Sequence, residues 1–213
     1  MKKYAVIVAG GSGTRMGANI PKQFLLLAGK PLLQHSVEAF LHAYPDLEII
    51  AVLPQSNNEP DVSYLQNNSR IKITTGGQTR FDSVSNGLKL AQKDSIIFVH
   101  DAVRCLVSVD LIRRCFEQAL EKGTAIPAVS SRDSIRWLEN DGSRALDRSR
   151  VMLVQTPQVF RGEIILQAFS QPYQESFTDE ASVVESFGYR VDLIKGEENN
   201  IKITTPVDLL IAE

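Results

Sequence analysis

The strongest constraint on the fold is an alternation of short, continuously apolar segments with longer segments of helical spacing. Strands are predicted for the segments rich in Val and Ile, at residues 4–9, 48–54, 71–75, 95–101 and 124–130. Residues 31–44 and 109–123 repeat apolar side chains every three or four positions, as helices do. Continuously apolar strands suit a sheet covered by helices on both faces, and strand–helix alternation favours parallel strands. The sequence therefore predicts an α/β fold with a mostly parallel central sheet.

The alternation is interrupted between about residues 131 and 155. This segment is charged, spaces its apolar residues like a hairpin and contains the turn signal Asn-Asp-Gly at 140–142. Ile135, Trp137 and Leu138 would form an exposed apolar patch unless something covers them. Two interpretations stay open from the pattern alone. The segment is either a protruding arm that packs on a second subunit or a flap folded back on its own core.

Size and charge exclude several classes of protein. The 213 residues suit a single domain, and the 23 Lys and Arg against 25 Asp and Glu give a formal net charge of -2. Binding to nucleic acid or to an anionic membrane relies on excess positive charge, so neither is expected. The first apolar segment ends at Gly10, too early for a secretory signal, and no segment reaches the ~18 apolar residues of a membrane span. We expect a cytoplasmic protein whose Cys105 and Cys115 are reduced.

A glycine-rich turn, AGGSGTRMG at residues 9–17, follows the first predicted strand. Backbone N–H groups in such a turn can approach phosphate oxygens closely. A Walker A loop would end in Gly-Lys-Ser/Thr, and a dinucleotide-binding loop would need a third glycine where Met16 stands. A P-loop NTPase and an NAD(P)H-dependent oxidoreductase are therefore both disfavoured.

Two cations accompany this turn, Arg15 within it and Lys22 just beyond it. Together they would concentrate positive charge on a polyphosphate, which suits nucleotidyl transfer because charge accumulates on the α-phosphate oxygens and on departing pyrophosphate. A surface turn with solvated cations is the alternative. The polar segments GGQTRFDS and HDAVR weigh against it, since they follow other predicted strands, where ligands of parallel sheets bind.

Eight segments carry a family resemblance along essentially the whole chain. They are AGGSGTRMG with PKQF, GGQTRFDSV, HDAVR, SRDSI, LDRS, QTPQVF, TDEAS and NIKITTP. The first resembles the signature of sugar-phosphate nucleotidyltransferases, and the set resembles the 2-C-methyl-D-erythritol 4-phosphate (MEP) cytidylyltransferase family of non-mevalonate isoprenoid biosynthesis. The resemblance implies a Rossmann-like three-layer sandwich and the conversion of CTP and MEP to 4-diphosphocytidyl-2-C-methyl-D-erythritol and pyrophosphate. It also implies Mg²⁺ bound mainly through the CTP phosphates, and a homodimer in which each arm completes the other subunit's site.

The resemblance also assigns roles to matching residues, with none assigned to a metal. Arg15 and Lys22 would be catalytic, as stabilisers of the transition state. The nucleotide-binding residues would be Ala9, Gly10, Gly11, Gly13, Gly77, Gln78, Ser83, Asp101 and Ala102. The residues for the acceptor substrate would be Asp101, Arg104, Ser134, Arg148, Thr156, Thr178 and Lys202.

Other interpretations exist for some of these residues and their neighbours. Asp82 is better explained as a helix cap than as a ligand. Asp101 could help hold a metal, whereas His100, like His35 and His42, is expected to be a packing residue. Arg148 alone would be one solvated cation of a hairpin. Lys202 lies between two isoleucines on a strand-like run, so it projects opposite to them, toward either solvent or the site.

Three positions depart from the family's usual pattern. Residues 8–11 read Val-Ala-Gly-Gly where Pro-Ala-Ala-Gly is frequent, which would loosen the loop. Cys105 stands where a proline usually follows the arginine, and a buried, inert thiol is preferred to a reactive one. Ser134 replaces the usual threonine and keeps its hydroxyl group.

Two other functions compete with the cytidylyltransferase hypothesis. Ribitol-5-phosphate cytidylyltransferases share the opening motif and the NIKITTP segment, although FTDEAS and LDRS are more similar to the MEP enzyme. A nucleotide-binding regulator could keep the fold without catalysis, but the presence of both Arg15 and Lys22 disfavours it.

Overall fold

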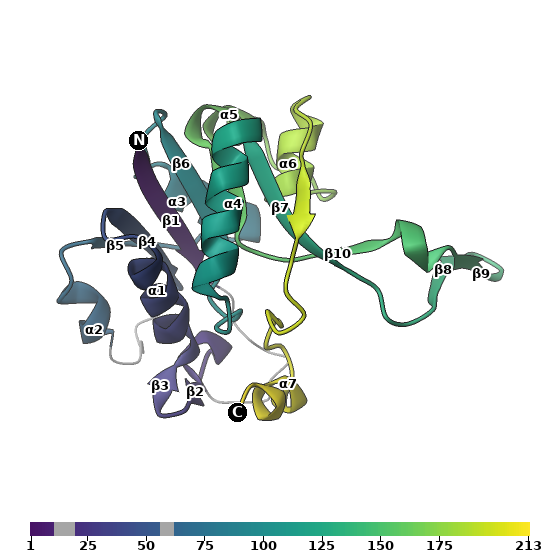
Figure 1. The fold of residues 1–213 in the computed structure, drawn as a ribbon, viewed down its shortest axis with the longest axis horizontal. Coiled ribbons are helices and arrows are strands. Elements are labelled where there is room, and N and C mark those ends of the chain that lie inside the picture. Colours follow the sequence, from purple (N-terminus) through teal and green to yellow (C-terminus); the bar gives the residue numbers. More distant parts are fainter. Residues whose placement is uncertain (11–19, 56–61) are drawn as a thin grey trace.

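The computed structural model describes residues 1–10, 20–55 and 62–213. Within these ranges, eight strands form one sheet in the order β10-β7-β11-β6-β1-β4-β5, and β12 also pairs with β7. Helices lie against this sheet, and a long β-arm leaves it at one side (Figure 1). No helix in the described ranges is long and apolar enough to span a bilayer.

The strands of the sheet are β1 (Lys2–Val8), β4 (Leu47–Leu53), β5 (Ile71–Thr75), β6 (Ser95–Asp101), β7 (Thr124–Ser130), β10 (Met152–Val154), β11 (Gln158–Arg161) and β12 (Leu193–Lys195). Two separate hairpins are formed by β2 (Leu26–Leu27) with β3 (Lys30–Pro31) and by β8 (Ile135–Glu139) with β9 (Gly142–Leu146). The helices are α1 (Leu32–Ala43), α2 (Ser63–Gln66), α3 (Arg80–Leu88), α4 (Val109–Lys122), α5 (Gly162–Ala168), α6 (Glu180–Ser186) and α7 (Pro206–Ala212). Short 3-10 turns are η2 (Lys22–Phe24) and η3 (Arg148–Arg150).

The centre of the sheet is parallel. Strand β1 pairs in parallel with β4 and β6, and β4 pairs in parallel with β5. Strand β11 runs antiparallel between β6 and β7. Each of the five strands expected from the apolar runs is present, so the prediction of an α/β fold with a mostly parallel sheet is confirmed.

Successive residues of the central strands enter two separate cores, because side chains alternate between the faces of a sheet. Ile7 and Ile49 face one core, which α1 and α4 cover. Val6 and Ile50 face the other, which α3, α5 and α6 cover. Burial on both faces explains why the middles of these strands are apolar at consecutive positions rather than at alternate ones.

The segment before α7 differs from the expected strand-like run. Residues 201–204 have no regular secondary structure. Ile203 is fully buried beside Val103, and its N–H donates to the carbonyl oxygen of Val103 at 3.0 Å. This anchoring fixes the segment without a strand, and Lys202 lines the pocket described below. The following helix α7 begins with Thr205 as its N-cap and Pro206 in its first turn.

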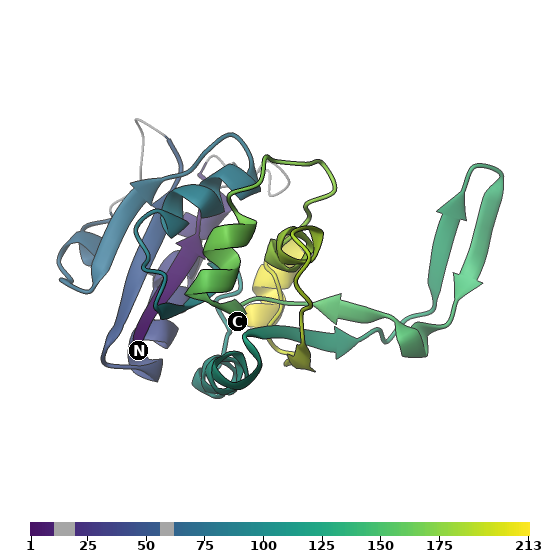
Figure 2. The same ribbon diagram turned by 90° about the horizontal axis from the view of Figure 1, so that it is seen from above.

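The segment between β7 and β10 is a protruding arm, and the alternative of a flap folded on its own core is wrong. Figure 2 shows its hairpin, β8 and β9, standing away from the body of the molecule. Glu139 pairs with Gly142 across the predicted turn. Trp137 and Leu138 are 56% and 81% exposed, so the described residues of the chain leave most of their apolar surfaces uncovered.

Candidate active site

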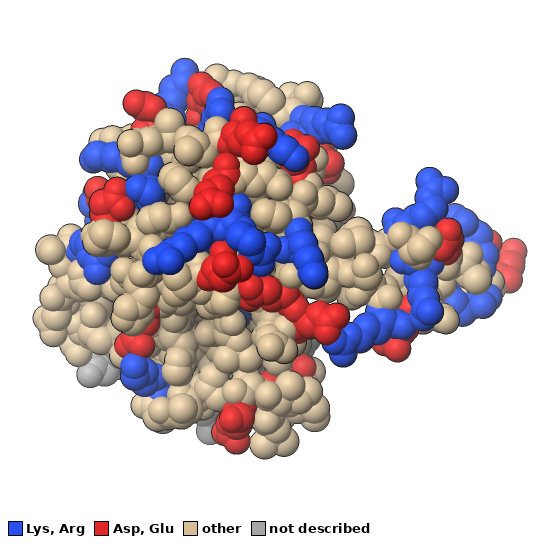
Figure 3. All heavy atoms as spheres, in the orientation of Figure 1, with Lys and Arg blue, Asp and Glu red and all other residues tan. Residues whose placement is uncertain are grey.

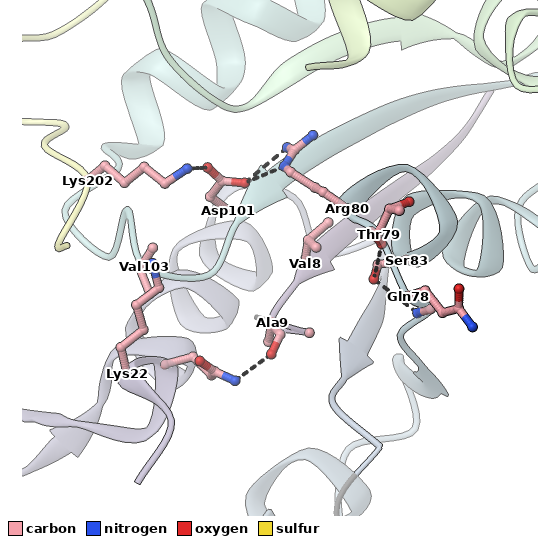
Figure 4. A pocket seen from close by; sticks show the side chains of 13 residues that line it. Val8, Ala9, Lys22, Gln78, Thr79, Arg80, Ser83, Asp101, Val103 and Lys202 are labelled. Atoms are coloured by element: carbon pink, nitrogen blue, oxygen red, sulfur yellow. Dashed lines mark hydrogen bonds and ion pairs between the residues drawn. The ribbon is translucent and has the colours of Figure 1, made fainter. Parts of the chain in front are cut away.

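A pocket of about 380 Å³ lies at the carboxyl ends of β1, β5 and β6. Its described lining residues are Val8, Ala9, Gly10, Lys22, Gln23, Gly77, Gln78, Thr79, Arg80, Ser83, Asp101, Val103 and Lys202. Figure 4 shows Lys22 and Lys202 on one side of this pocket and Gln78 to Ser83 on the other. The carboxyl edge of a parallel sheet is where ligands bind in this class of fold.

The loop between β5 and α3 is shaped by its own hydrogen bonds. Thr79 caps α3, with its Oγ1 accepting from the N–H of Asp82 at 3.1 Å, while Oδ2 of Asp82 accepts from the N–H of Thr79 at 3.0 Å. Asp82 is therefore a capping residue, as predicted. The Ser83 hydroxyl donates to the Thr79 carbonyl at 2.9 Å and accepts from the N–H of Gly77 at 3.1 Å.

Where the loops after β1 and β5 meet, Gly77 has no room for a side chain and Gly10 has little. A Cβ on Gly77 would lie 2.2 Å from Cβ of Asp82, and one on Gly10 would lie 3.2 Å from Oγ of Ser83. Ala9 is held by its N–H bond to Val52 at 2.9 Å and accepts from Nε2 of Gln23 at 2.5 Å. The predicted loop residues Gly11, Gly13 and Arg15 lie outside the described residues.

Asp101, at the end of β6, lies between two cations in the pocket. Its Oδ1 accepts from Nη2 of Arg80 at 3.0 Å and from Nε at 3.3 Å, and its Oδ2 accepts from Nζ of Lys202 at 2.7 Å. Burial acts to raise the pKa of Asp101, but Arg80 and Lys202 outweigh it and hold the pKa well below its usual range. Asp101 therefore carries its negative charge at neutral pH.

Arg80 and Glu180 form a second ion pair directly behind Asp101. Nη1 and Nη2 of Arg80 donate to the Glu180 carboxylate, Nη2 at 3.1 Å to Oε2. Arg80 is the first residue of α3, where the helix dipole disfavours a cation. The carboxylates of Asp101 and Glu180 compensate for this unfavourable interaction of the Arg80 charge with the helix dipole. Neither Arg80 nor Glu180 was predicted from the sequence, although an arginine at a predicted helix start is a signal that carboxylates lie nearby.

A buried hydrogen-bond network lies below Asp101. Oγ1 of Thr156 accepts from the N–H of Asp101 at 3.0 Å and lies 3.1 Å from Nδ1 of His100, whose Nε2 lies 3.2 Å from the Arg104 carbonyl oxygen. Burial lowers the pKa of His100 to about 4, so the ring is neutral. His100 is a packing residue, as predicted.

Three other predicted residues have contacts elsewhere in the chain. Ala102 is buried, and its N–H donates to the Val8 carbonyl at 3.1 Å. Arg104 donates to the Asn200 carbonyl at 2.7 Å. Thr178 is exposed just before α6, with its N–H bonded to Oγ of Ser182 at 3.1 Å. None of these three is among the described residues that line the pocket.

The arm keeps two predicted residues out of the pocket of their own chain. Ser134 and Arg148 are exposed on the arm, and neither is among the described lining residues. Nη1 of Arg148 donates to the Arg132 carbonyl at 2.8 Å. A single chain therefore does not bring these two side chains to the site.

The remaining histidines and the thiol near the site have simpler explanations. Nε2 of His35 lies 2.8 Å from the Leu27 carbonyl oxygen, which fits a packing role. His42 was expected to pack as well, but it is exposed because it lies on the outer face of α1. Burial raises the pKa of Cys105 to about 11, which supports an inert, protonated thiol.

The family follows from comparison with known proteins. A family model described as IspD, 2-C-methyl-D-erythritol 4-phosphate cytidylyltransferase, matches residues 4–213. The chain belongs to the MEP cytidylyltransferase family. A protein of that name from Bacteroides thetaiotaomicron is 45% identical over 214 residues, covering 99% of this chain and 98% of that protein. The one from Porphyromonas gingivalis is 46% identical over 221 residues, covering 100% and 96%.

Solved structures of MEP cytidylyltransferases share the fold. The Francisella tularensis enzyme superimposes with a TM-score of 0.84 at 33% identity, covering 100% of this chain and 98% of that chain. The Thermus thermophilus enzyme gives 0.81 at 31% identity with the same coverage. The fold expected from the family resemblance is thus confirmed across the chain.

Proposed function

We propose that this protein is a cytoplasmic MEP cytidylyltransferase, which converts CTP and MEP to 4-diphosphocytidyl-2-C-methyl-D-erythritol and pyrophosphate. The observation that carries the proposal is the family match over residues 4–213. The pocket is consistent with this reaction, because glycine-containing loops and the cations Lys22 and Lys202 line it at the carboxyl edge of the sheet. Such a pocket suits a polyphosphate ligand.

The reaction needs no covalent enzyme intermediate. A phosphate oxygen of MEP attacks the α-phosphorus of CTP, the bond from that phosphorus to the oxygen bridging to the β-phosphate breaks, and pyrophosphate leaves. The MEP phosphate is ionised at neutral pH and is itself the nucleophile. The protein therefore contributes alignment and charge neutralisation rather than a general base.

The assigned roles at the nucleotide follow this chemistry. Lys22 and Arg15 stabilise charge that develops on the α-phosphate and on pyrophosphate. Backbone N–H groups of the loop that contains Gly10, Gly11 and Gly13 bind the triphosphate. Gly77, Gln78 and Ser83 surround the cytosine, where a small pocket excludes a purine by size.

Asp101 and Ala102 are assigned to the nucleotide side, and Asp101 also receives hydrogen bonds from hydroxyls of the acceptor substrate. Arg104, Thr156, Thr178 and Lys202 form the acceptor side of the site. The ion pair between Lys202 and Asp101 supports this arrangement, because it brings the C-terminal segment to the end of β6.

Mg²⁺ is proposed as the metal, bound mainly through the CTP phosphates. Asp101 is the single carboxylate among the described residues that line the pocket, and both its oxygens face cations. No group of three His, Cys, Asp or Glu in the described ranges could hold a metal. This donor set fits an ion that would be held mainly by phosphate oxygens, with Asp101 as the carboxylate of the described lining that would lie on the same pocket. When bound, the ion would neutralise phosphate charge.

A homodimer through the arm is proposed because large apolar side chains of the arm are left exposed by the described residues of their own chain. Trp137 and Leu138 are exposed there. Figure 3 shows a concentration of basic side chains on the same arm. In a dimer, Ser134 and Arg148 of one subunit would enter the other subunit's acceptor site.

The test is pyrophosphate release with CTP and Mg²⁺, with MEP and ribitol 5-phosphate offered in parallel and with ATP, GTP and UTP as nucleotide controls. Selective turnover of CTP with MEP is expected. Preference for ribitol 5-phosphate would contradict the acceptor assignment. Absence of turnover with either acceptor would contradict the proposal and favour a nucleotide-binding regulator.

A further inference from the structure

We infer that Glu180 is a positioning residue for this reaction, which acts by holding Arg80 against Asp101. The inference rests on the proposed function. Glu180 does not line the pocket in the described structure, whereas Arg80 and Asp101 both do. Its effect on the substrates must therefore pass through the other two side chains.

The contacts leave Arg80 little freedom. Its Nη1 and Nη2 donate to the two oxygens of Glu180, and its Nε and Nη2 donate to Oδ1 of Asp101. All three guanidinium nitrogens therefore face carboxylates. A planar guanidinium held along two edges has a defined orientation. Arg80 is thus committed to Asp101 rather than available to grip a triphosphate.

Glu180 is itself fixed by the sheet. Its side chain is 1% exposed. The adjacent residues are bound to Gln158 of β11, whose Nε2 donates to Asp179 at 2.9 Å and whose Oε1 accepts from the N–H of Ala181 at 2.8 Å. A site is positioned accurately when its supporting groups are fixed by packing and hydrogen bonds. Glu180 meets this condition because the start of α6 is tied to β11.

The charges explain why a carboxylate is needed there. Arg80 and Lys202 balance Asp101 and Glu180, giving two positive and two negative groups in contact. Without Glu180, the guanidinium would lose half of its carboxylate partners and could turn toward the phosphates. Asp101 would then keep Lys202 but lose the fixed contact at its Oδ1.

The first experiment compares Glu180→Gln with Glu185→Gln, the same substitution at an exposed position of α6. Glu180→Gln is expected to lower kcat/KM for CTP and MEP by roughly 10- to 100-fold, the scale of a small displacement of substrate-positioning groups. Glu180→Asp should restore part of the loss because it restores the charge. Glu185→Gln should match the wild type. Wild-type kinetics for a folded Glu180→Gln variant would overturn the inference.

A double-substitution cycle separates positioning from a general structural effect. In an Asp101→Asn background, Glu180→Gln should cause little further loss, because the residue through which it acts is already altered. An equal fold-loss in both backgrounds would contradict the inference. The same cycle is run on CTP binding by calorimetry, so that it can be read even if the wild type releases no pyrophosphate. Failure of the wild type to bind CTP would overturn both the proposed function and this inference.

The single substitution leaves Arg80, whose side chain is 32% exposed, without one of its two carboxylate partners, so it can impair folding. The double variant Arg80→Gln with Glu180→Gln removes both charges and provides a folded alternative. Its kcat/KM is expected to equal that of Arg80→Gln alone. A further loss beyond Arg80→Gln would show that Glu180 acts by another route and would overturn the inference.

Discussion

At the scale of single residues, the site depends on charged side chains that meet across long stretches of sequence. Arg80 contacts Glu180 from 100 positions away, and Asp101 contacts both Arg80 and Lys202. Each of these contacts joins a charge to an opposite charge in a partly buried place. These charged side chains are therefore held in position by their ion pairs as much as by the backbone that carries them.

Lys22→Ala is expected to lower turnover about 100-fold, the scale of losing one transition-state charge contact. The thermal midpoint should change little, because Lys22 is partly exposed in the short turn η2. Pyrophosphate release and thermal unfolding are measured on the same samples. Lys30→Ala, which removes a surface ion pair with Glu38, is the matched control and should leave turnover unchanged. Near-normal turnover in Lys22→Ala would remove Lys22 from the mechanism.

His100 should make the protein less stable in mild acid. Its pKa in the folded state is about 4, below its ordinary value of 6.5. Between these values the unfolded chain binds more protons, so the free energy of unfolding falls as pH decreases from 6.5 toward 4. From about pH 7 to about pH 4.5 the loss attributable to His100 is about 2 kcal/mol. Urea unfolding at both pH values measures it.

Two histidine variants check that assignment. His100→Gln stays neutral at both pH values, so its pH-dependent loss should be smaller by about that amount. His42→Gln changes an exposed histidine and should keep the full loss. An unchanged pH dependence in His100→Gln would show that other groups cause the effect.

At the scale of elements, the loop from β5 into α3 shapes the pocket. Thr79 and Asp82 cap the helix, Ser83 bonds back to the loop, and Gly77 packs against Asp82 without a side chain. The same few residues therefore begin the helix and line the pocket. A substitution in this loop should therefore weaken ligand binding by more than its effect on the free energy of unfolding would suggest.

Gly77→Ala tests this coupling. Its Cβ would lie 2.2 Å from Cβ of Asp82, so the loop must move. We expect KM for CTP to rise about 10-fold or more, in line with the sensitivity of bound substrates to small displacements. Gly188→Ala is the control, since Gly188 has φ +97 and open space around it. That variant should lose stability through strain while keeping KM for CTP. Equal KM values in the two variants would contradict the coupling.

At the scale of the whole molecule, the arm separates two groups of predicted residues. Lys22, Asp101 and Lys202 gather in the pocket, while Ser134 and Arg148 are exposed on the arm. The proposed dimer would reunite the two groups across subunits. A chain acting alone would leave the acceptor site without its arm residues.

Mixing two inactive variants tests this arrangement. Lys22→Ala and Arg148→Ala homodimers should each be strongly impaired. After unfolding and refolding together, random pairing should restore about a quarter of wild-type activity, because half of the dimers would carry one intact site of two. Light scattering gives the mass of the assembly. A monomeric wild type, or no recovery in the mixture, would contradict a shared site.

The sequence alone determined the class of fold and predicted the edge of the sheet at which the pocket lies. Strands at 4–9 and 95–101 were predictable because burial on both faces demands apolar side chains at consecutive positions, which is a local signal. The ligand segments followed from the rule that ligands bind beyond the carboxyl ends of parallel strands. The helix caps at Asp82 and Thr205 were also predictable, because a capping residue lies within one turn of the helix start that it caps.

Only the tertiary structure decided how distant residues meet. Hairpin spacing predicts that two strands pair, but not whether the hairpin packs against the body of the molecule or stands away from it. The choice between arm and flap was therefore decided only in the folded chain. The pairing of Arg80 with Glu180 depended on the first residues of α3 and α6 being brought together across 100 positions of sequence, which neither segment encodes by itself. Local patterns report on neighbours within a turn or a strand, whereas an active site is assembled by contacts between segments that only the folded chain brings together.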